Sequence, residues 1–212
     1  MAHVDYRWQE KVQPPRAQGM TTPLERWTGA FGDEYTTRNT VKWWDRVGPW
    51  QSILGDLRFS RVLEVGAGVG GNLLALRQLG YDAEGFEPNE AARVRARNVY
   101  IADGALPNLP TGPTSSYGLA FTCGVLIHIP PEEIPAAMAE MYRVSSKYLL
   151  AIEYYWPTPV EVPYRGESGL LWKRDFGRAY LEQFPDLRLI RCGWLTKAEG
   201  FDDCMFWLME KP

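Results

Sequence analysis

The stretch Arg61–Leu76, RVLEVGAGVGGNLLAL, determines how the rest of the sequence is interpreted. An apolar run that contains Glu64 leads into four glycines within Gly66–Gly71, and a second apolar run follows. This pattern predicts a buried strand, a tight turn and the beginning of a helix. Glycine permits the turn and lets the backbone approach a ligand closely. We therefore expect a ligand-binding turn at the carboxyl end of this strand.

The composition narrows the class of protein. Among 212 residues, 45% are hydrophobic and 23% are charged, as in ordinary globular proteins. The net charge of −3 disfavours nucleic acid as a partner but leaves a local basic patch open. The three cysteines are far apart, which argues against a disulfide framework and structural zinc. No apolar run reaches the length of a membrane span, and no signal-peptide core opens the chain, so we expect a soluble protein in the cytoplasm.

Three segments follow along the chain. Residues 1–22 are polar and contain Pro-Pro, which predicts a flexible N-terminal arm. Residues 23–58 are predicted to form a helical lid, with a helical period over Thr36–Leu57 and a break at Gly48-Pro49. Four of the nine tryptophans fall in this lid, and they either line a pocket or pack the lid. Residues 59–212 are predicted to form the catalytic domain.

Short apolar runs alternate with helical patterns in this domain. The predicted strands are Val62–Val65, Ala83–Phe86, Val99–Ala102, Leu119–Thr122, Tyr148–Glu153, Leu187–Trp194 and Asp203–Glu210. The predicted helices are Gly71–Leu79, Asn89–Val94, Glu133–Val144 and Arg174–Gln183. This alternation predicts an α/β fold with a mostly parallel seven-stranded sheet and helices on both faces. The last two strands are expected to pair antiparallel at the sheet edge.

Two carboxylates indicate which ligand the glycine turn binds. Glu87 ends the second predicted strand, 16 residues after Gly71, where a carboxylate accepts hydrogen bonds from ribose hydroxyls. Glu64 lies next to the turn, where it would repel a pyrophosphate and attract a cation. We therefore expect a cationic ligand that contains adenosine, and a dinucleotide oxidoreductase is a weaker alternative.

The motifs VLEVGAGVGGN and GFEPN, with Asp103 after the third strand, resemble those of class I S-adenosylmethionine-dependent methyltransferases. Further stretches, among them ERWTGAFGDEYTTRN, FTCGVLIHIPPEE and IEYYWPTPVEVPYRG, resemble the methylases associated with pseudaminic-acid biosynthesis. The resemblance implies a Rossmann-like methyltransferase fold, S-adenosyl-L-methionine as cofactor and a sugar-like acceptor.

The resemblance also implies roles for individual residues. Glu64 orients the cofactor ammonium, Glu87 binds the ribose hydroxyls, and Asp103 accepts from the adenine amino group. The other implied cofactor contacts are Gly66, Ala67, Gly68 and Asn72 at the methionine part, Pro88, Gly104 and Ala105 at the adenine, the carbonyls of Thr122 and Cys123 at the ammonium, and the lid residues Tyr35, Arg38 and Asn39 at the carboxylate.

Each of these roles has a structural alternative. Glu64 would instead cap the following helix, Asp103 would form a turn before Gly104, and Arg38 would be a solvated helix residue. Cys123 is better interpreted as a small buried hydrophobic residue than as a nucleophile.

The acceptor side is expected near the ends of the fourth and fifth strands. Methyl transfer to a hydroxyl requires alignment and removal of a proton, and His128 has a suitable side chain for that proton. Packing against the loop before Pro130 is an equally weighted alternative. The other catalytic candidates are Glu153 and Tyr154. The substrate-binding candidates are Tyr155, Tyr164, Arg165, Lys173 and Arg174, of which the three cations are predicted to form a cluster for a phosphate or carboxylate.

The sequence therefore predicts a methyltransferase that acts on a small polar acceptor, such as a sugar or nucleotide sugar. It shows TCGV where DNA amino-methylases carry an Asp/Asn-Pro-Pro-aromatic tetrapeptide, which disfavours that reaction. Methylation of a nucleobase or tRNA, and a cofactor-binding module without turnover, are the alternatives. No metal site is expected, and the oligomeric state stays open.

Overall fold

The fold is known from a computed structural model that describes residues 22–40, 42–111 and 116–212. The predicted N-terminal arm, residues 1–22, lies outside the described residues apart from its last position. None of the described helices is long and apolar enough to cross a membrane.

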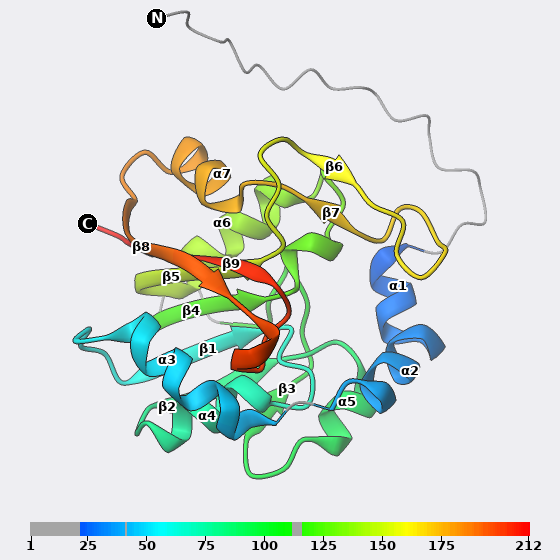
Figure 1. Cartoon of the computed structure of the whole chain (residues 1–212), viewed down its shortest axis with the longest axis horizontal. Helices are drawn as coiled ribbons and strands as arrows, with labels where there is room; N and C mark the ends of the chain where they lie inside the picture. Colours follow the sequence, from blue (N-terminus) through cyan, green and yellow to red (C-terminus); the bar gives the residue numbers. More distant parts are fainter. Residues whose placement is uncertain (1–21, 41, 112–115) are drawn as a thin grey trace, which may run out of the picture.

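One seven-stranded sheet forms the centre of the molecule, in the order β3-β2-β1-β4-β5-β9-β8 (Figure 1). Its strands are β1 (Arg61–Val65), β2 (Asp82–Phe86), β3 (Tyr100–Ala102), β4 (Tyr117–Cys123), β5 (Ser145–Glu153), β8 (Arg188–Leu195) and β9 (Cys204–Glu210). The pairs among β1 to β5 are parallel, whereas β9 runs antiparallel to both β5 and β8. This topology confirms the predicted fold class.

The helices lie close to their predicted positions in the domain. They are α1 (Pro23–Thr28), α2 (Ala30–Arg38), η1 (Trp43–Arg46), α3 (Val47–Leu54), α4 (Gly71–Gln78), α5 (Glu90–Arg95), η2 (Leu126–His128), α6 (Ile134–Val144), α7 (Phe176–Gln183) and η3 (Lys197–Glu199). The predicted break at Gly48-Pro49 is wrong, because both residues lie inside α3. Pro49 is in the first turn of α3, where a backbone N–H has no intrahelical acceptor, so proline is tolerated.

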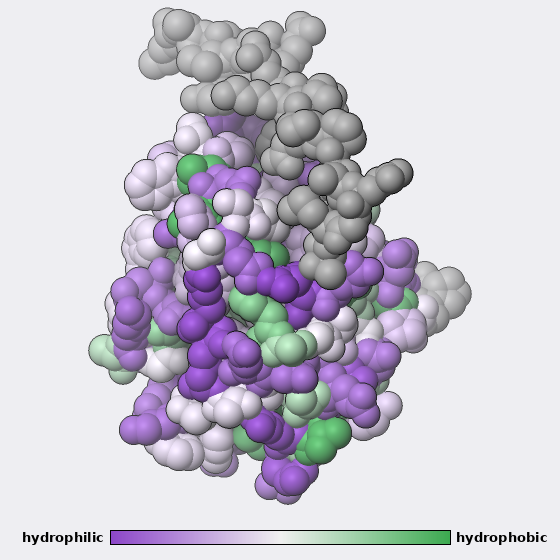
Figure 2. Space-filling view, turned by 90° about the vertical axis from the view of Figure 1, so that its right-hand side faces the viewer, coloured by the Kyte–Doolittle hydropathy of each residue, from purple (hydrophilic) through white to green (hydrophobic). Residues whose placement is uncertain are grey.

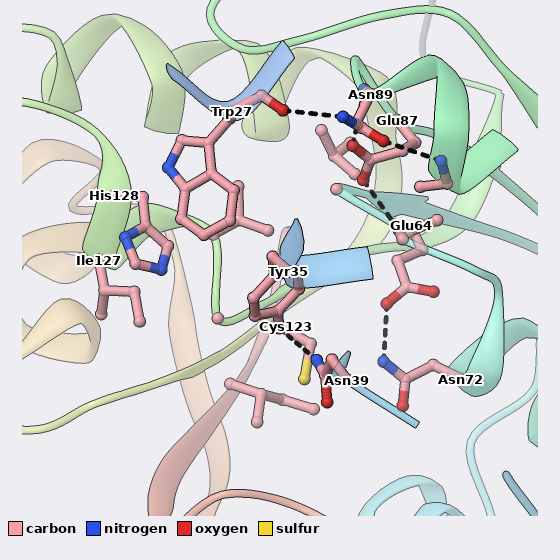
Figure 3. A pocket seen from close by; sticks show the side chains of 18 of the residues that line it. Trp27, Tyr35, Asn39, Glu64, Asn72, Glu87, Asn89, Cys123, Ile127 and His128 are labelled. Atoms are coloured by element: carbon pink, nitrogen blue, oxygen red, sulfur yellow. Dashed lines mark hydrogen bonds between the residues drawn. The ribbon is translucent and has the colours of Figure 1, made fainter. Parts of the chain in front are cut away.

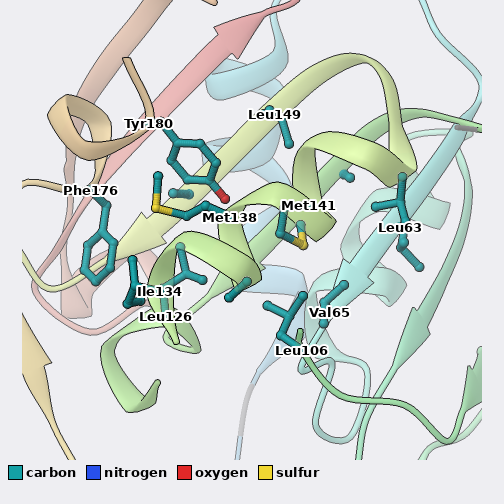
Figure 4. Close-up of a cluster of buried hydrophobic side chains, with 14 of the residues drawn as sticks. Leu63, Val65, Leu106, Leu126, Ile134, Met138, Met141, Leu149, Phe176 and Tyr180 are labelled. Carbon is teal, nitrogen blue, oxygen red and sulfur yellow. The ribbon is translucent and has the colours of Figure 1, made fainter. Parts of the chain in front are cut away.

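Side chains alternate across the sheet and form two cores. On one face, Val62 packs with Trp50 of α3 and Leu76 of α4. On the other face, Leu63 belongs to a cluster with residues of α6 and α7, including Met141 and Tyr180 (Figure 4). The short connections that leave the carboxyl ends of the strands therefore emerge from a rigid layer.

The segment after β5 contains a small hairpin that the sequence analysis did not predict. Its strands β6 (Val160–Glu161) and β7 (Trp172–Lys173) pair antiparallel in a separate sheet. The hairpin lies beside α1 and α2 (Figure 1), and Arg26 of α1 forms an ion pair with Glu167 of the connecting loop. The lid and the hairpin together cover the carboxyl ends of the parallel strands.

The opposite edge of the sheet is formed by β8. Its pairing with β9 shifts register between Leu189 and Arg191. The Arg191 guanidinium donates hydrogen bonds to the carbonyl oxygens of Ser52 and Ile53 in α3. The edge strand is therefore irregular and is tied to the neighbouring helix.

Candidate active site

A cavity of about 740 Å³ lies between the lid and the carboxyl ends of β1, β2, β4 and β5. Its walls come from the glycine turn, the segments after β2, β3 and β4, helices α1 and α2, and the loop that includes η3. The outer surface of the lid is mainly hydrophilic (Figure 2). On the part of that face formed by the described residues, hydrophilic side chains dominate and hydrophobic ones are scattered (Figure 2).

Three backbone donors at the start of the glycine turn are bonded within the protein. The N–H groups of Gly66 and Ala67 donate to the carbonyl of Phe86 at 2.7 and 3.0 Å, and that of Gly68 donates to Glu87 Oε2 at 2.9 Å. These bonds fix the turn against the end of β2. A carboxyl group, Glu64, lies beside the turn, and it favours a ligand with positive charge over a pyrophosphate.

Glu64 is 2% exposed, and one of its two carboxyl oxygens accepts a hydrogen bond. Its Oε1 accepts a hydrogen bond of 2.7 Å from Asn72 Nδ2 (Figure 3), whereas the buried Oε2 has no partner among the residues that the structure describes. Burial raises the pKa of Glu64 to about 8, which favours the neutral acid. A ligand ammonium at Oε2 would satisfy the oxygen and favour the ionised form. The alternative of a helix cap is wrong, because the N-cap of α4 is Gly70 and no side chain caps it.

Glu87 connects the second motif to the turn. Its Oε1 accepts from the Asn89 N–H at 2.9 Å, and burial raises its pKa. Asn89 Nδ2 in turn donates to the Trp27 carbonyl at 3.1 Å and to Asp33 Oδ1 at 2.8 Å. Glu87, Pro88 and Asn89 all line the cavity. The lid is thus docked directly on the segment expected to hold the ribose.

Asp103 does not reach the cavity. Its side chain is 75% exposed and forms an ion pair of 2.9 Å with Arg93. Gly104 and Ala105 line the cavity beside it. The predicted contact between the Asp103 carboxylate and adenine is therefore absent from this arrangement, because Arg93 holds the carboxylate outside.

The lid brings two of its three predicted residues to the cavity. Tyr35 and Asn39 line it, and Asn39 contacts the Tyr35 hydroxyl (Figure 3). Arg38 is exposed, and its guanidinium lies over the rings of Phe31 and Tyr35 at 5.9 and 5.5 Å. The solvated-helix alternative for Arg38 therefore describes its position.

Arg46, rather than Arg38, is the lid arginine that lines the cavity. It lines the cavity, donates to Asn72 Oδ1 at 2.8 Å through Nη1, and donates to the Gly200 carbonyl at 2.8 Å through Nε. Its guanidinium also lies 4.4 Å from the Phe201 ring. The arginine thereby joins the lid, the glycine-turn helix and the C-terminal loop near Glu64. The predicted helix over Thr36–Leu57 gave no reason to single it out.

The end of β4 contributes backbone and a thiol. Thr122 is fully buried in the strand and does not line the cavity, whereas Cys123 does. Burial raises the pKa of Cys123 to about 12. The thiol is therefore neutral, in agreement with its interpretation as a small hydrophobic residue.

The three catalytic candidates line the cavity but differ in what they can do. Glu153 accepts from the backbone N–H groups of Val125, Leu126 and Ile127 at 3.2, 3.1 and 3.4 Å. Burial raises the pKa of Glu153 to about 7. Its carboxyl holds the segment that carries His128, which is a positioning role.

Tyr154 donates to Asp202 Oδ2 at 3.0 Å, and burial raises the pKa of its hydroxyl. A phenol that is harder to ionise is a poor base. His128 is different: its Nδ1 lies 2.6 Å from the Leu170 carbonyl, and burial lowers its pKa to about 4. The lowered pKa keeps the imidazole neutral at the cavity wall and also makes it a weaker base than a solvent-exposed histidine.

The predicted substrate-binding group is mostly separated from the cavity. Of its members, Tyr164 alone lines it, and Tyr155 packs against Trp194 and Trp207. None of the three predicted cations lines the cavity, so they do not form part of its wall. Arg165 lies over Tyr164, Lys173 over Tyr154, and the 2%-exposed Arg174 over Phe176.

Trp27 lines the cavity, whereas the sequence left open whether the lid tryptophans line a pocket or pack the lid. Its ring centroid is 4.5 Å from that of His128, and it also contacts Phe31, Tyr35 and Tyr164. Trp50, in contrast, does not line the cavity and is fully buried in the core. Within the described residues, no cluster of histidine, cysteine and carboxylate side chains is arranged to hold a metal ion.

The sheet order and a cation-seeking carboxylate beside a glycine turn are those of a methyltransferase that uses S-adenosylmethionine. A family described as a methyltransferase domain matches residues 33–187. The chain belongs to this family, and it is an S-adenosylmethionine-dependent methyltransferase. No curated protein is similar enough in sequence to match.

Solved structures share the fold at low sequence identity. Magnesium protoporphyrin IX methyltransferase from Synechocystis, with bound SAM, is 15% identical, covers 92% of this chain and 100% of its own, and has a TM-score of 0.66. The glycopeptide N-methyltransferase complexed with SAM is 13% identical, covers 79% and 93%, and has a TM-score of 0.57. A methyltransferase from Methanosarcina mazei is 16% identical, covers 76% and 96%, and has a TM-score of 0.59. At these identities the similarity shows the fold.

Proposed function

We propose that the protein transfers a methyl group from S-adenosylmethionine to a small polar metabolite, with His128 as the base. The observation that carries this proposal is the position of His128 on the wall of the cavity that also contains Glu64 and Glu87. The donor supplies an activated methyl group, so the chain must bind the acceptor, align it, exclude water and accept a proton.

The acceptor we favour is a sugar or a related ring-bearing metabolite. The resemblance to methylases associated with pseudaminic-acid biosynthesis supports it, as do the rings of Trp27 and Tyr164 along the cavity. A nucleotide sugar is less well supported than the sequence indicated, because Arg165, Lys173 and Arg174 do not line the cavity.

The test is mass spectrometry of cell extract incubated with the protein and isotope-labelled S-adenosylmethionine. We expect a new small molecule that carries one labelled methyl group. His128→Ala should slow its formation more than it weakens binding of S-adenosylhomocysteine. Labelled tRNA or oligonucleotide would establish the nucleic-acid alternative. Intact cofactor binding with no labelled product would favour the module without turnover.

A further inference from the structure

A carboxylate with no assigned role lies on the cavity wall just before β9. Asp202 belongs to the loop between η3 and β9 and lines the cavity. Its Oδ2 accepts a hydrogen bond of 3.0 Å from the Tyr154 hydroxyl, whereas its Oδ1 has no hydrogen-bond partner among the described residues. Asp202 is exposed rather than buried, so a molecule in the cavity is able to reach its carboxylate.

Among the described residues, no cation forms an ion pair with this carboxylate. Lys197 lines the cavity and Lys173 lies over a neighbouring tyrosine ring, but neither is paired with Asp202. Arg46 donates its hydrogen bonds to an amide and a backbone carbonyl instead. Along the described wall, carboxyl side chains outnumber lysine and arginine side chains. This part of the cavity therefore favours a positively charged group over an anion.

Three tyrosines share the region of the carboxylate. Tyr35, Tyr154 and Tyr164 all line the cavity. Burial raises the pKa of the Tyr154 hydroxyl, and the charge of Asp202 raises it further. Burial also raises the pKa of Tyr35, and the charges of Tyr164 and Asp202 add to this effect. Because such effects weaken with distance, the three phenols lie near Asp202, and aromatic rings add to the attraction of a carboxylate for a cation.

The position of Asp202 separates it from the expected cofactor site. Glu64 lies on β1, and β4 and β5 stand between that strand and β9 in the sheet. Three strand spacings amount to about 14 Å. A cation at Asp202 is therefore kept away from the positive charge of the methyl donor, and a ring-shaped molecule is able to extend from Asp202 toward His128.

We propose that the acceptor carries a protonated amino group that binds Asp202, and that the methyl group goes to a different atom of the same molecule. This inference rests on the proposed function and specifies its substrate class as an aminated, ring-bearing metabolite. Asp202 determines specificity, and the Tyr154 hydroxyl orients its carboxylate through Oδ2. An ammonium has no lone pair for attack, so it anchors the molecule and leaves the reaction to a second nucleophilic group near His128.

The test compares three probes that share a cyclohexane ring: cyclohexylamine, which is ionised at pH 7, cyclohexanol and cyclohexanecarboxylate. Each is titrated into the full chain saturated with S-adenosylhomocysteine, and NMR shift changes give the dissociation constants. The ammonium should bind the wild type about 10-fold more tightly than the alcohol, and the carboxylate should bind least. Asp202→Asn, which keeps an oxygen for the Tyr154 hydroxyl and removes the charge, should abolish this preference.

Asp203→Asn is the matched control, because Asp203 is the exposed neighbour and does not line the cavity. It should retain the preference for the ammonium. No binding of cyclohexylamine, equal binding of the amine and the alcohol, or equal effects of the two substitutions would overturn the proposal.

Turnover gives a second readout that separates this inference from the proposed function. With the metabolite identified in extract, Asp202→Asn should raise KM about 10-fold and leave kcat largely unchanged, as expected for a group that only anchors the acceptor. A methylated product without a basic amino group would leave the proposed function standing and refute the amino anchor. Absence of any methylated product would refute the proposed function alone, because the probe titrations require no turnover.

Discussion

Asn72 Nδ2 donates a hydrogen bond of 2.7 Å to Glu64 Oε1, while the buried Glu64 Oε2 has no hydrogen-bond partner among the described residues. The oxygen of the same amide accepts from Arg46 at 2.8 Å and from Trp50 Nε1 at 3.3 Å. Asn72 therefore links Arg46 of the lid to the carboxyl group of Glu64.

Glu64→Gln should uncouple cofactor binding from proton release. Because burial raises the pKa of Glu64 to about 8, the carboxyl is mostly protonated at pH 7 before the cofactor binds, and binding of an ammonium should expel that proton. Calorimetry of S-adenosylhomocysteine binding in two buffers of different ionisation enthalpy measures the release. The wild type should release close to one proton, and the glutamine variant should release none and bind more weakly. Equal release in both proteins would contradict the role assigned to Glu64.

The same substitution should change the pH dependence of stability. The folded pKa of Glu64 is raised from 4.5 to about 8, so the folded protein holds more protons than the unfolded chain between these values. The contribution of Glu64 to stability is therefore complete below pH 4.5 and is lost as the pH rises toward 8. Denaturant unfolding at several pH values should show a flatter profile for Glu64→Gln than for the wild type across this window.

Arg46→Ala should weaken cofactor binding and stability together. It removes hydrogen bonds to Asn72 and Gly200 that join three parts of the chain. We expect a loss of about 1–3 kcal/mol in unfolding free energy and about 10-fold weaker binding of S-adenosylhomocysteine. Arg38→Ala is the matched control, since Arg38 is exposed on the same lid, and its stability should stay within about 0.5 kcal/mol of the wild type. A larger effect of Arg38→Ala than of Arg46→Ala on binding would reverse the assignment.

Glu87→Ala should reduce cofactor affinity by more than its lost ribose contact, because the carboxylate also accepts from the N–H groups of Gly68 and Asn89. About 10- to 100-fold weaker binding is expected for the loss of hydrogen bonds to a charged group. Calorimetric titration measures it. Unchanged affinity would show that the ribose lies elsewhere.

Gly177→Ala should destabilise the protein although alanine is the better helix former of the two. A Cβ at Gly177 in α7 would lie 2.1 Å from Trp207 Cδ1, so the buried indole must move. Overpacking of this kind costs about 1–3 kcal/mol. Gly48→Ala in α3 is the control, since a Cβ there meets nothing within 4 Å, and it should be neutral or stabilising. The midpoints of denaturant unfolding distinguish the two.

The sequence predicted the sheet and the glycine turn because both depend on local pattern. Gly66 illustrates why: its φ is +75°, and a Cβ would lie 2.3 Å from Val125, so the turn tolerates no other residue easily. Asp103 and Arg46 show where local pattern is insufficient. Asp103 is turned away by Arg93, ten positions earlier, and Arg46 gains its role from Asn72 and Gly200 in distant segments. Trp27 belongs to the same class, because only the docking of α1 brings its ring beside His128 at the cavity.

The irregular pairing of β8 has a consequence for behaviour at high concentration. An outermost strand with regular, unpaired backbone groups is a template on which strands from other molecules add. Here the register shift at Leu189/Arg191 interrupts that template, and the arginine side chains of β8 place positive charge along it. This border should therefore resist fibril-like growth, and straightening it by removal of the extra residue should make the protein prone to aggregate.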